Sequence, residues 1–197
     1  MSTDQHAVDR RQGSARSRIL QAAAARFYAD GIAATGIDAI TASAGVAKMS
    51  LYNNFASKAA LVEAYVEARH EEWLQLYRVR VQDTSTPQER VLAVFDAYAD
   101  HAAAAYEQGF RGCGLLNAAA ELSAADPART AVRRHKEQVE QLLLDPLGEL
   151  TDPATAHRLA EHLSFLLEGS MARAGLEGEP ARLLRARAIA ADLLAAR

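Results

Sequence analysis

Several features that define other protein classes are scarce in this chain of 197 residues. Its one cysteine, Cys113, excludes an internal disulfide and a zinc site built on several thiolates. No uncharged stretch reaches the roughly 18 apolar residues that a membrane-spanning helix needs. The segment from Met1 to Arg11 is polar and lacks the apolar core of a signal peptide. We therefore expect a soluble, cytoplasmic protein with no membrane partner, no metal and no cofactor.

Signals for β-structure are also weak. Valine, isoleucine and threonine are few, and no segment alternates apolar and polar residues as a half-buried strand does. Alanine, the strongest helix former, accounts for 44 of the 197 residues. Apolar residues recur at spacings of three and four, which places them on one face of a helix; the first such group is Ile19, Leu20, Ala23, Ala24 and Phe27. The chain is predicted to be all-α.

Glycine, proline and capping residues divide the chain into about nine predicted helices. Residues 1–13 show no pattern and are predicted to form a flexible arm. Pro146 is expected to end or kink the seventh helix near Leu144. The expected helices span about 14–30, 37–44, 46–55, 58–82, 87–108, 115–122, 127–144, 153–175 and 181–196.

Residues 37–54 have the pattern of a helix-turn-helix. Such a unit needs a glycine in its turn, here Gly45, and apolar residues that hold two short helices at a steep angle. Its second helix would lie in a DNA major groove. Simple packing of two short helices is the alternative explanation of this spacing. The residues that the second helix would present to DNA are Ala47, Lys48, Met49, Ser50 and Asn53.

The charge distribution favours the DNA-binding interpretation. The formal net charge of −3 argues against a nucleic-acid partner when taken alone. However, residues 1–60 hold seven Lys/Arg and four Asp/Glu, which gives a local charge of +3. Residues 61–197 hold fifteen Lys/Arg and twenty-one Asp/Glu, which gives a local charge of −6. The basic excess therefore accompanies the helix-turn-helix, where phosphate contacts are needed.

The run ATGIDAITASAGVAKMSLYNNFASKAAL, from Ala34 to Leu61, closely resembles the DNA-binding segment of the tetracycline-repressor (TetR) family of bacterial transcription regulators. The resemblance implies a DNA-binding domain over 14–60 with three helices, and a helical-bundle domain over 61–197 that binds a small ligand and dimerises. Residues 111–122 also resemble a segment of many family members without a known inducer. The residues that carry the main match are Phe27, Gly31, Ile37, Ile40, Ala44, Gly45, Val46, Lys48, Leu51, Tyr52, Phe55, Ser57, Lys58 and Leu61.

The same resemblance assigns roles in DNA binding. Thr35 and Gly36 fall where the family uses a hydroxyl and helix-end amides on a phosphate. Since Gly36 replaces the usual threonine or serine, Thr35 is expected to supply the hydroxyl. Tyr52 and Lys58 match family residues that contact the DNA backbone, and Asn54 stands where histidine is most frequent but can still hydrogen-bond a phosphate.

Base contacts follow from side-chain chemistry. Asn53 can make a bidentate contact to adenine, and Lys48 can donate to guanine. A solvated surface is the alternative for both residues, and core packing is the alternative for Tyr52.

The predicted body offers candidates for an effector site and a dimer interface. Aromatic walls with a few convergent polar groups suit a ligand, although core packing is the alternative for each one; these candidates are Trp73, Tyr77, Phe95, Tyr98, Phe110, Cys113, Asn117, Glu121, His162 and Phe165. The last two predicted helices have wide apolar faces that would form a four-helix interface in a homodimer; their residues are Leu159, Leu163, Leu166, Leu167, Ser170, Leu183, Leu184, Ile189, Leu193 and Leu194.

Catalytic interpretations have little support. Glu67 and His70 have the spacing of half a di-iron carboxylate site, but His157 and Glu161 are four residues apart and do not supply the second half. Cys113 precedes a helix N-terminus, which can lower a thiol pKa, so a redox sensor and an inert thiol both stay open. A metal oxidase and a structural helical adaptor are the alternatives. We expect a non-enzymatic regulator, a repressor that an unidentified small molecule releases from double-stranded operator DNA.

Overall fold

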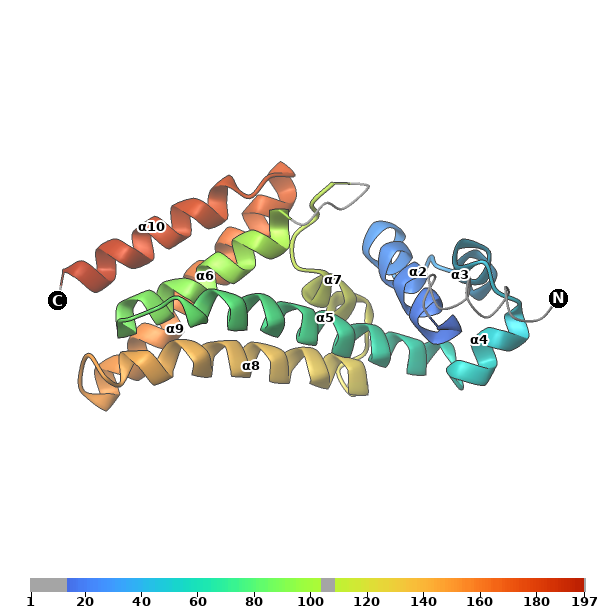
Figure 1. Ribbon diagram of the computed structural model, residues 1–197, viewed down its shortest axis with the longest axis horizontal. Coiled ribbons are helices and arrows are strands. Elements are labelled where there is room, and N and C mark those ends of the chain that lie inside the picture. The colour runs from blue at the N-terminus through green and yellow to red at the C-terminus, as the bar shows by residue number, and fades with distance from the viewer. Residues whose placement is uncertain (1–13, 104–108, 197) are drawn as a thin grey trace.

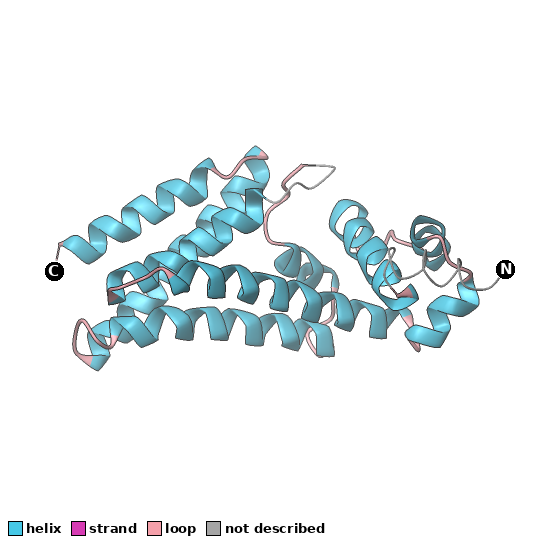
Figure 2. Cartoon of the chain, in the orientation of Figure 1, coloured by secondary structure: helices cyan, strands magenta, loops and turns pink. Residues whose placement is uncertain are grey.

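Every regular element in the computed structural model is a helix over the ranges that it describes, 14–103 and 109–196 (Figure 1, Figure 2). The predicted all-α fold is confirmed. The predicted arm at 1–13 and the end of the helix expected over 87–108 lie outside the described residues. The helices within these ranges are α2 (Ala15–Asp30), α3 (Ile37–Ala44), α4 (Lys48–Asn54), α5 (Lys58–Gln82), α6 (Pro87–Ala103), α7 (Gly114–Glu121), α8 (Pro127–Leu147), α9 (Pro153–Glu177) and α10 (Ala181–Ala195).

Side-chain caps begin several of these helices where the sequence predicts them. The oxygens of Ser14, Ser57, Asp126 and Asp152 each accept a hydrogen bond from a backbone N–H in the first turn of the following helix. Such caps satisfy amides that have no partner inside the helix. The starts of α2, α5, α8 and α9 are therefore determined by local sequence.

Helix α8 extends past the predicted end. Pro146 lies inside its last turn, and the helix continues to Leu147, where the N–H of Gly148 bonds to the carbonyl of Leu144 at 2.9 Å. Proline removes one backbone hydrogen bond, but the Pro146 ring is buried. Burial of the ring offsets that lost bond, so the expectation that the helix ends near Leu144 is wrong by a few residues.

Helices α2, α3 and α4 form a three-helix unit, which we call the head. Ile19, Ile40 and Leu51 contribute one fully buried side chain from each helix. Gly45 joins α3 to α4 with a φ of +62°, a left-handed conformation that glycine adopts without a steric penalty. The predicted helix-turn-helix is thus present in the head.

The remaining helices, α5 to α10, form the body. Helix α5 runs from the head into the body, where it packs on α6 and α8, while α10 packs on α6 and α9 (Figure 1). The short helix α7 contacts α2, α5 and α8. This places α7 between the head and the bundle.

A close backbone contact fixes the segment that leads into α7. A Cβ atom added to Gly175, near the end of α9, would lie 2.5 Å from the nitrogen and 2.6 Å from the Cα of Gly112. Real Cβ atoms do not approach backbone so closely, so only glycine permits α9 to pack against this segment. The position of residues 111–113 therefore depends on Gly175.

We expect Gly175→Ala to lower the free energy of unfolding by about 1–3 kcal/mol, because the methyl group overpacks a backbone contact. Gly148→Ala is the matched control: its φ of −63° suits alanine and only ordinary contacts surround the added atom. Loss of unfolded-state entropy should make the control neutral or more stable by up to about 1 kcal/mol. Equal stabilities of the two variants in urea unfolding would contradict the close contact.

Candidate nucleic-acid interface and effector sites

Helix α4 presents its predicted recognition face to solvent. Met49 is 70% exposed and Tyr52 is 45% exposed, whereas Leu51 is fully buried against the head. This exposure excludes the alternative that Tyr52 is mainly a core residue. The other residues of this face are the exposed Ala47, Lys48 and Asn53 and the half-buried Ser50.

Lys48 is paired with a residue that the sequence analysis missed. Its Nζ lies 2.9 Å from Oδ1 of Asp38 in the first turn of α3, and this hydrogen bond raises the pKa of Lys48. Both side chains are more than half exposed, so solvent screens the pair. A contact between Lys48 and a base would compete with this pair.

The predicted role of Thr35 is wrong. Its side chain is only 2% exposed, and its hydroxyl donates a hydrogen bond of 2.6 Å to the carbonyl of Gly31. The hydroxyl therefore closes the loop between α2 and α3 and does not face a phosphate. Gly36 is exposed and is the N-cap of α3, which leaves the backbone amides of the first turn for an anion.

The side chains of two other predicted phosphate contacts bond to backbone carbonyls of the head. Asn54 is half-buried, and its Nδ2 donates to a carbonyl one turn earlier in α4 at 2.8 Å. Lys58 donates from Nζ to the carbonyl of Ile32 at 2.6 Å. Arg16, which the sequence analysis missed, donates to the Asn54 carbonyl and lies 4.4 Å from the centre of the Phe55 ring. These bonds hold α4 and the start of α5 against the rest of the head.

Glu121, the last residue of α7, binds the head directly. Its Oε1 accepts from the N–H of Ile32 at 2.9 Å, and its Oε2 accepts from the N–H of Ala33 at 2.7 Å. Lys58 bonds to the carbonyl of the same Ile32. The loop between α2 and α3 is thus held by both α7 and α5.

Arg111 makes a second attachment between head and body. Its Nη1 donates to the carbonyls of Tyr28, at 3.0 Å, and Ala29. Its backbone N–H donates to the Tyr28 hydroxyl at 2.5 Å, and that hydroxyl donates to the carbonyl of Gly112. Because α2 has no basic residue in its last turn, Arg111 supplies positive charge at its C-terminus. Neither Arg111 nor Tyr28 was predicted from sequence; the resemblance of residues 111–122 was a signal for Arg111 alone.

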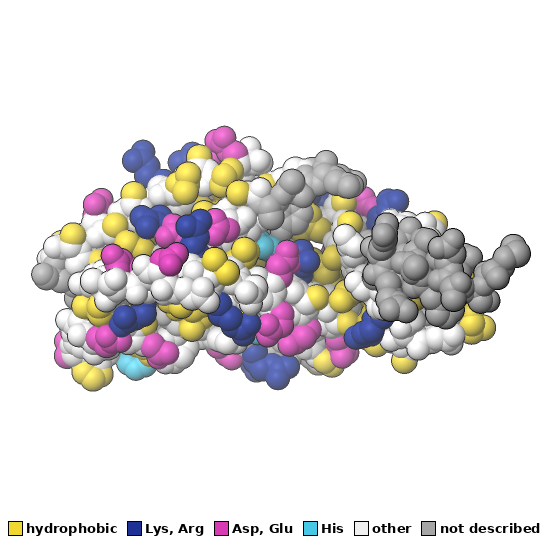
Figure 3. All heavy atoms as spheres, in the orientation of Figure 1, with side chains coloured by type: hydrophobic (Ala, Val, Ile, Leu, Met, Phe, Trp, Pro, Cys, Tyr) yellow, Lys and Arg dark blue, Asp and Glu magenta, His cyan; other side chains and the backbone are white. Residues whose placement is uncertain are grey.

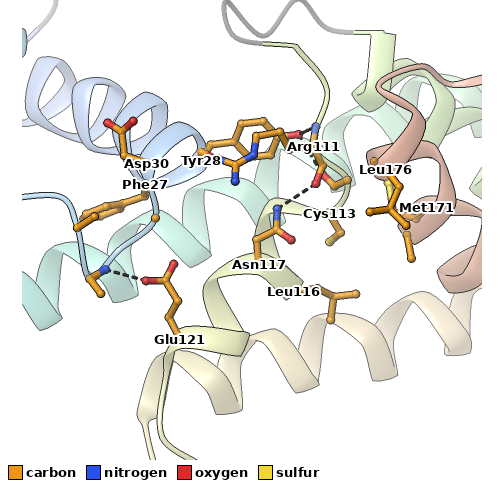
Figure 4. Close-up of a pocket in the computed structure, with 16 residues that line it drawn as sticks. Phe27, Tyr28, Asp30, Arg111, Cys113, Leu116, Asn117, Glu121, Met171 and Leu176 are labelled. Atoms are coloured by element: carbon orange, nitrogen blue, oxygen red, sulfur yellow. Dashed lines mark hydrogen bonds between the residues drawn. The ribbon is translucent and has the colours of Figure 1, made fainter.

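A cleft of about 680 Å³ lies between the head and the body (Figure 4). The end of α2 and the loop after it form one side, the segment 111–121 forms another, and the end of α9 forms the third. Figure 4 shows Arg111 and Glu121 on either side of Asn117, each reaching toward the head. Three of the predicted effector residues line this cleft: Cys113, Asn117 and Glu121.

One cavity inside the body is far smaller than this cleft. A cavity of about 10 Å³, close to the volume that one water molecule requires, is lined by Trp73 and Tyr98 with His101 and His135. Tyr77 stacks on Trp73 with ring centres 5.8 Å apart. Aromatic side chains that the sequence predicts as pocket walls therefore pack against one another.

The polar groups in this interior are neutral or paired. Burial, together with the positive charge of Lys136, lowers the pKa of His101 to about 4 and that of His135 to about 3, so both rings are neutral at pH 7. The Nζ of Lys136 lies 2.7 Å from Oε1 of Glu168. The Nδ1 atoms of His70 and His135 lie 2.8 Å apart. Glu168 thus compensates the charge of Lys136, and His70 supplies a partner for His135.

The remaining effector candidates lie outside both cavities. Phe95 and Phe110 are buried in the core. His162 is exposed and Phe165 is 64% exposed on the outer side of α9, so neither contributes to a pocket wall. The 3.6-residue period places side chains on a helix face, but it does not say whether that face turns inward or outward.

The apolar faces of α9 and α10 are divided between core and surface. Four candidates for the dimer interface are at most 4% exposed, so their side chains belong to the subunit core and are not available to a partner; they are Leu159, Leu163, Leu167 and Leu183. Leu166 and Ser170 are half-buried, and Leu194 is buried. The exposed apolar residues of these helices are Phe165, Leu176, Leu184, Ile189 and Leu193, and Figure 3 shows apolar side chains along α10.

Within 14–103 and 109–196, no group of three or more His, Cys, Asp or Glu side chains is placed to hold a metal ion. No helix in the same ranges is long and apolar enough to cross a membrane.

Comparisons with known proteins agree with the geometry. The pattern of the family described as "Bacterial regulatory proteins, tetR family" matches residues 19–65. The repressor KstR2 of Mycobacterium tuberculosis is 28% identical over 145 residues, which cover 72% of this chain and 70% of that protein.

Solved structures extend the match to most of the chain. SCO4454, a TetR-family transcriptional regulator from Streptomyces coelicolor, is 30% identical with a TM-score of 0.82, and the alignment covers 91% of this chain and 93% of that one. A putative TetR regulator, sav143 from Streptomyces avermitilis, is 30% identical with a TM-score of 0.72. That alignment covers 90% of this chain and 98% of the other. This chain therefore belongs to the TetR family of DNA-binding transcriptional regulators.

Proposed function

We propose that the protein is a homodimeric repressor that leaves its operator when a small molecule binds, and that it has no catalytic activity. The observation that carries this proposal is the recognition face of α4, where Met49, Tyr52 and Asn53 are exposed while Leu51 anchors the helix. The basic charge of residues 1–60 supports contact with phosphates. The name of the relative KstR2 supports repression. A regulator of this kind acts in the cytoplasm, where the DNA is.

Operator recognition divides into two kinds of contact. Tyr52 and the first-turn amides of α3 would position the head on phosphates, and Asn53 and Lys48 would read bases. Lys58, which holds the loop after α2, supports the head and can meet a phosphate with its remaining N–H groups. Two heads at about 34–36 Å would read successive major grooves.

The dimer interface would use the exposed apolar side chains of α9 and α10. Phe165 and Leu184 are both more than half exposed, and Ile189 and Leu193 are at least 40% exposed. Burying such side chains gives about 25 cal/mol for each Å² removed from water. The leucines packed inside the subunit would support these helices from behind.

Effector control follows from the attachment of the head. A ligand can change operator affinity only if it binds the operator-competent arrangement and the released arrangement with different affinities. In this chain the head position depends on α5, on Glu121 and on Arg111. A ligand that moves any of these would alter the spacing of the two recognition helices.

Two substitutions on α4 should have different effects in gel shifts with DNA from upstream of the gene. Tyr52→Phe should weaken binding to every sequence by about tenfold or more, because it removes a hydrogen bond to a charged phosphate. Asn53→Ala should reduce the free energy of operator binding by about 1–3 kcal/mol and relax the sequence preference at one base position. Arg133→Gln, a control on α8, should leave binding unchanged. The proposed function fails if the unmodified protein prefers no sequence over random DNA.

Asp38→Asn should strengthen DNA binding by about twofold to fivefold at low salt, because it frees Lys48 from an exposed ion pair. Asp30→Asn removes the same charge from the head but leaves Lys48 paired, since Asp30 is paired with Arg26. Asp30→Asn should therefore increase DNA affinity less than Asp38→Asn does. Fluorescence anisotropy titrations measure the DNA affinity of both variants. If their affinities rise equally, net charge alone explains the effect and Lys48 has no special role.

A further inference from the structure

We propose that the effector site is the cleft between head and body, and that its ligands are amphipathic organic carboxylates. This inference rests on the proposed control of operator binding by a small molecule. It concerns a site distinct from the interior of the bundle, where the aromatic candidates of the body lie.

Space is the first observation in favour of the cleft. Small-molecule sites usually enclose about 300–1,000 Å³ and often lie at domain boundaries. The cleft has about 680 Å³, whereas the cavity among Trp73, Tyr98 and His135 has about 10 Å³. A ligand in the bundle interior would have to displace packed rings, but a ligand in the cleft would not.

The charges around the cleft select the class of ligand. Glu121 accepts from two backbone amides, and Asp30 is paired with Arg26. Arg111 is exposed, and its described side-chain acceptors are the neutral carbonyls of Tyr28 and Ala29. A guanidinium binds a carboxylate more strongly than it binds a neutral carbonyl. Arg111 is therefore the group in the cleft that gains most from an anionic ligand.

Apolar surface next to Arg111 completes the site. Leu116 of α7 is 39% exposed, Leu176 of α9 is 84% exposed, and Met171 and Phe27 form deeper parts of the wall. Figure 4 shows Leu116, Met171 and Leu176 together on the side of the cleft away from the head. A ligand with a charged end at Arg111 and an aliphatic chain along Leu116 and Leu176 would match this arrangement.

The location explains how binding would be transmitted. A carboxylate that recruits Arg111 would withdraw its guanidinium from the last carbonyls of α2. The head would then keep its attachments through Glu121, through α5 and through the Tyr28 hydroxyl. The ligand would therefore favour arrangements in which α2 has moved from the body, and it would bind them more tightly than the operator-bound arrangement.

The test measures octanoate and octan-1-ol binding to the full-length dimer by calorimetry. The two probes share one chain, so their difference reports the charged group. Octanoate should bind more tightly than octanol. Arg111→Gln should lower the affinity for octanoate by at least about threefold, which is in the upper part of the range for an exposed ion pair. The variant should leave octanol unchanged, which also shows that the cleft has folded. Arg133→Gln, a charge-loss control outside the cleft, should change neither.

A second variant tests the location independently of charge. Ala172 lies on the exposed side of α9 and lines the cleft. Ala172→Phe should therefore fill part of the cleft and prevent the binding of both octanoate and octan-1-ol. Tyr98→Phe alters the bundle interior and should leave both unchanged. The inference is overturned if octanoate does not bind, if Arg111→Gln has no effect on it, or if Tyr98→Phe abolishes binding while Ala172→Phe does not.

Gel shifts separate this inference from the proposed function. A protein that binds its operator and is released by other small molecules, but does not bind octanoate, refutes the cleft assignment alone. A protein that binds octanoate in the cleft and shows no operator preference refutes the proposed function and leaves the site standing.

Discussion

The segment 111–121 attaches the head to the body at both of its ends. Glu121 binds two amides of the loop after α2, and Arg111 binds the carbonyls at the end of α2. These contacts involve both ends of one short segment, and Gly175 permits the close packing that holds it against α9. The orientation of the recognition helix consequently depends on a few side-chain hydrogen bonds to the backbone of the head, together with the apolar packing of α2 on α5, where the rings of Phe27 and Tyr65 lie 5.5 Å apart.

This kind of attachment suits a protein that must change its affinity for DNA. Hydrogen bonds to charged groups such as Glu121 and Arg111 contribute about 1.5–3 kcal/mol each, so a ligand of ordinary affinity can displace one of them. Ile40 of the head and Leu163 of the body are both fully buried and belong to one continuous apolar core. A movement of the head must therefore also shift the packing of α2 on α5, where Phe27 contacts Tyr65.

The elements that were predictable from sequence are those fixed by local chemistry. Serine and aspartate caps, the glycine at position 45 and the period of apolar residues placed most helices correctly. Features that depend on tertiary contacts were not predictable: the inward hydroxyl of Thr35, the pairing of Lys48 with Asp38, and the burial of Leu159 within the subunit while Phe165 points outward. Periodicity also could not show that aromatic side chains would fill the bundle and leave the larger cavity at the domain boundary.

We infer that contacts of α7 with the head set operator affinity. Hydrogen exchange at the amides of Ile32 and Ala33, measured together with operator affinity in Glu121→Gln, tests it most directly. If these contacts set operator affinity, both amides exchange faster, because a neutral amide side chain can accept only one such bond well, and the operator affinity differs from that of the unmodified protein. Faster exchange with unchanged operator affinity and unchanged release by effectors would show that they do not.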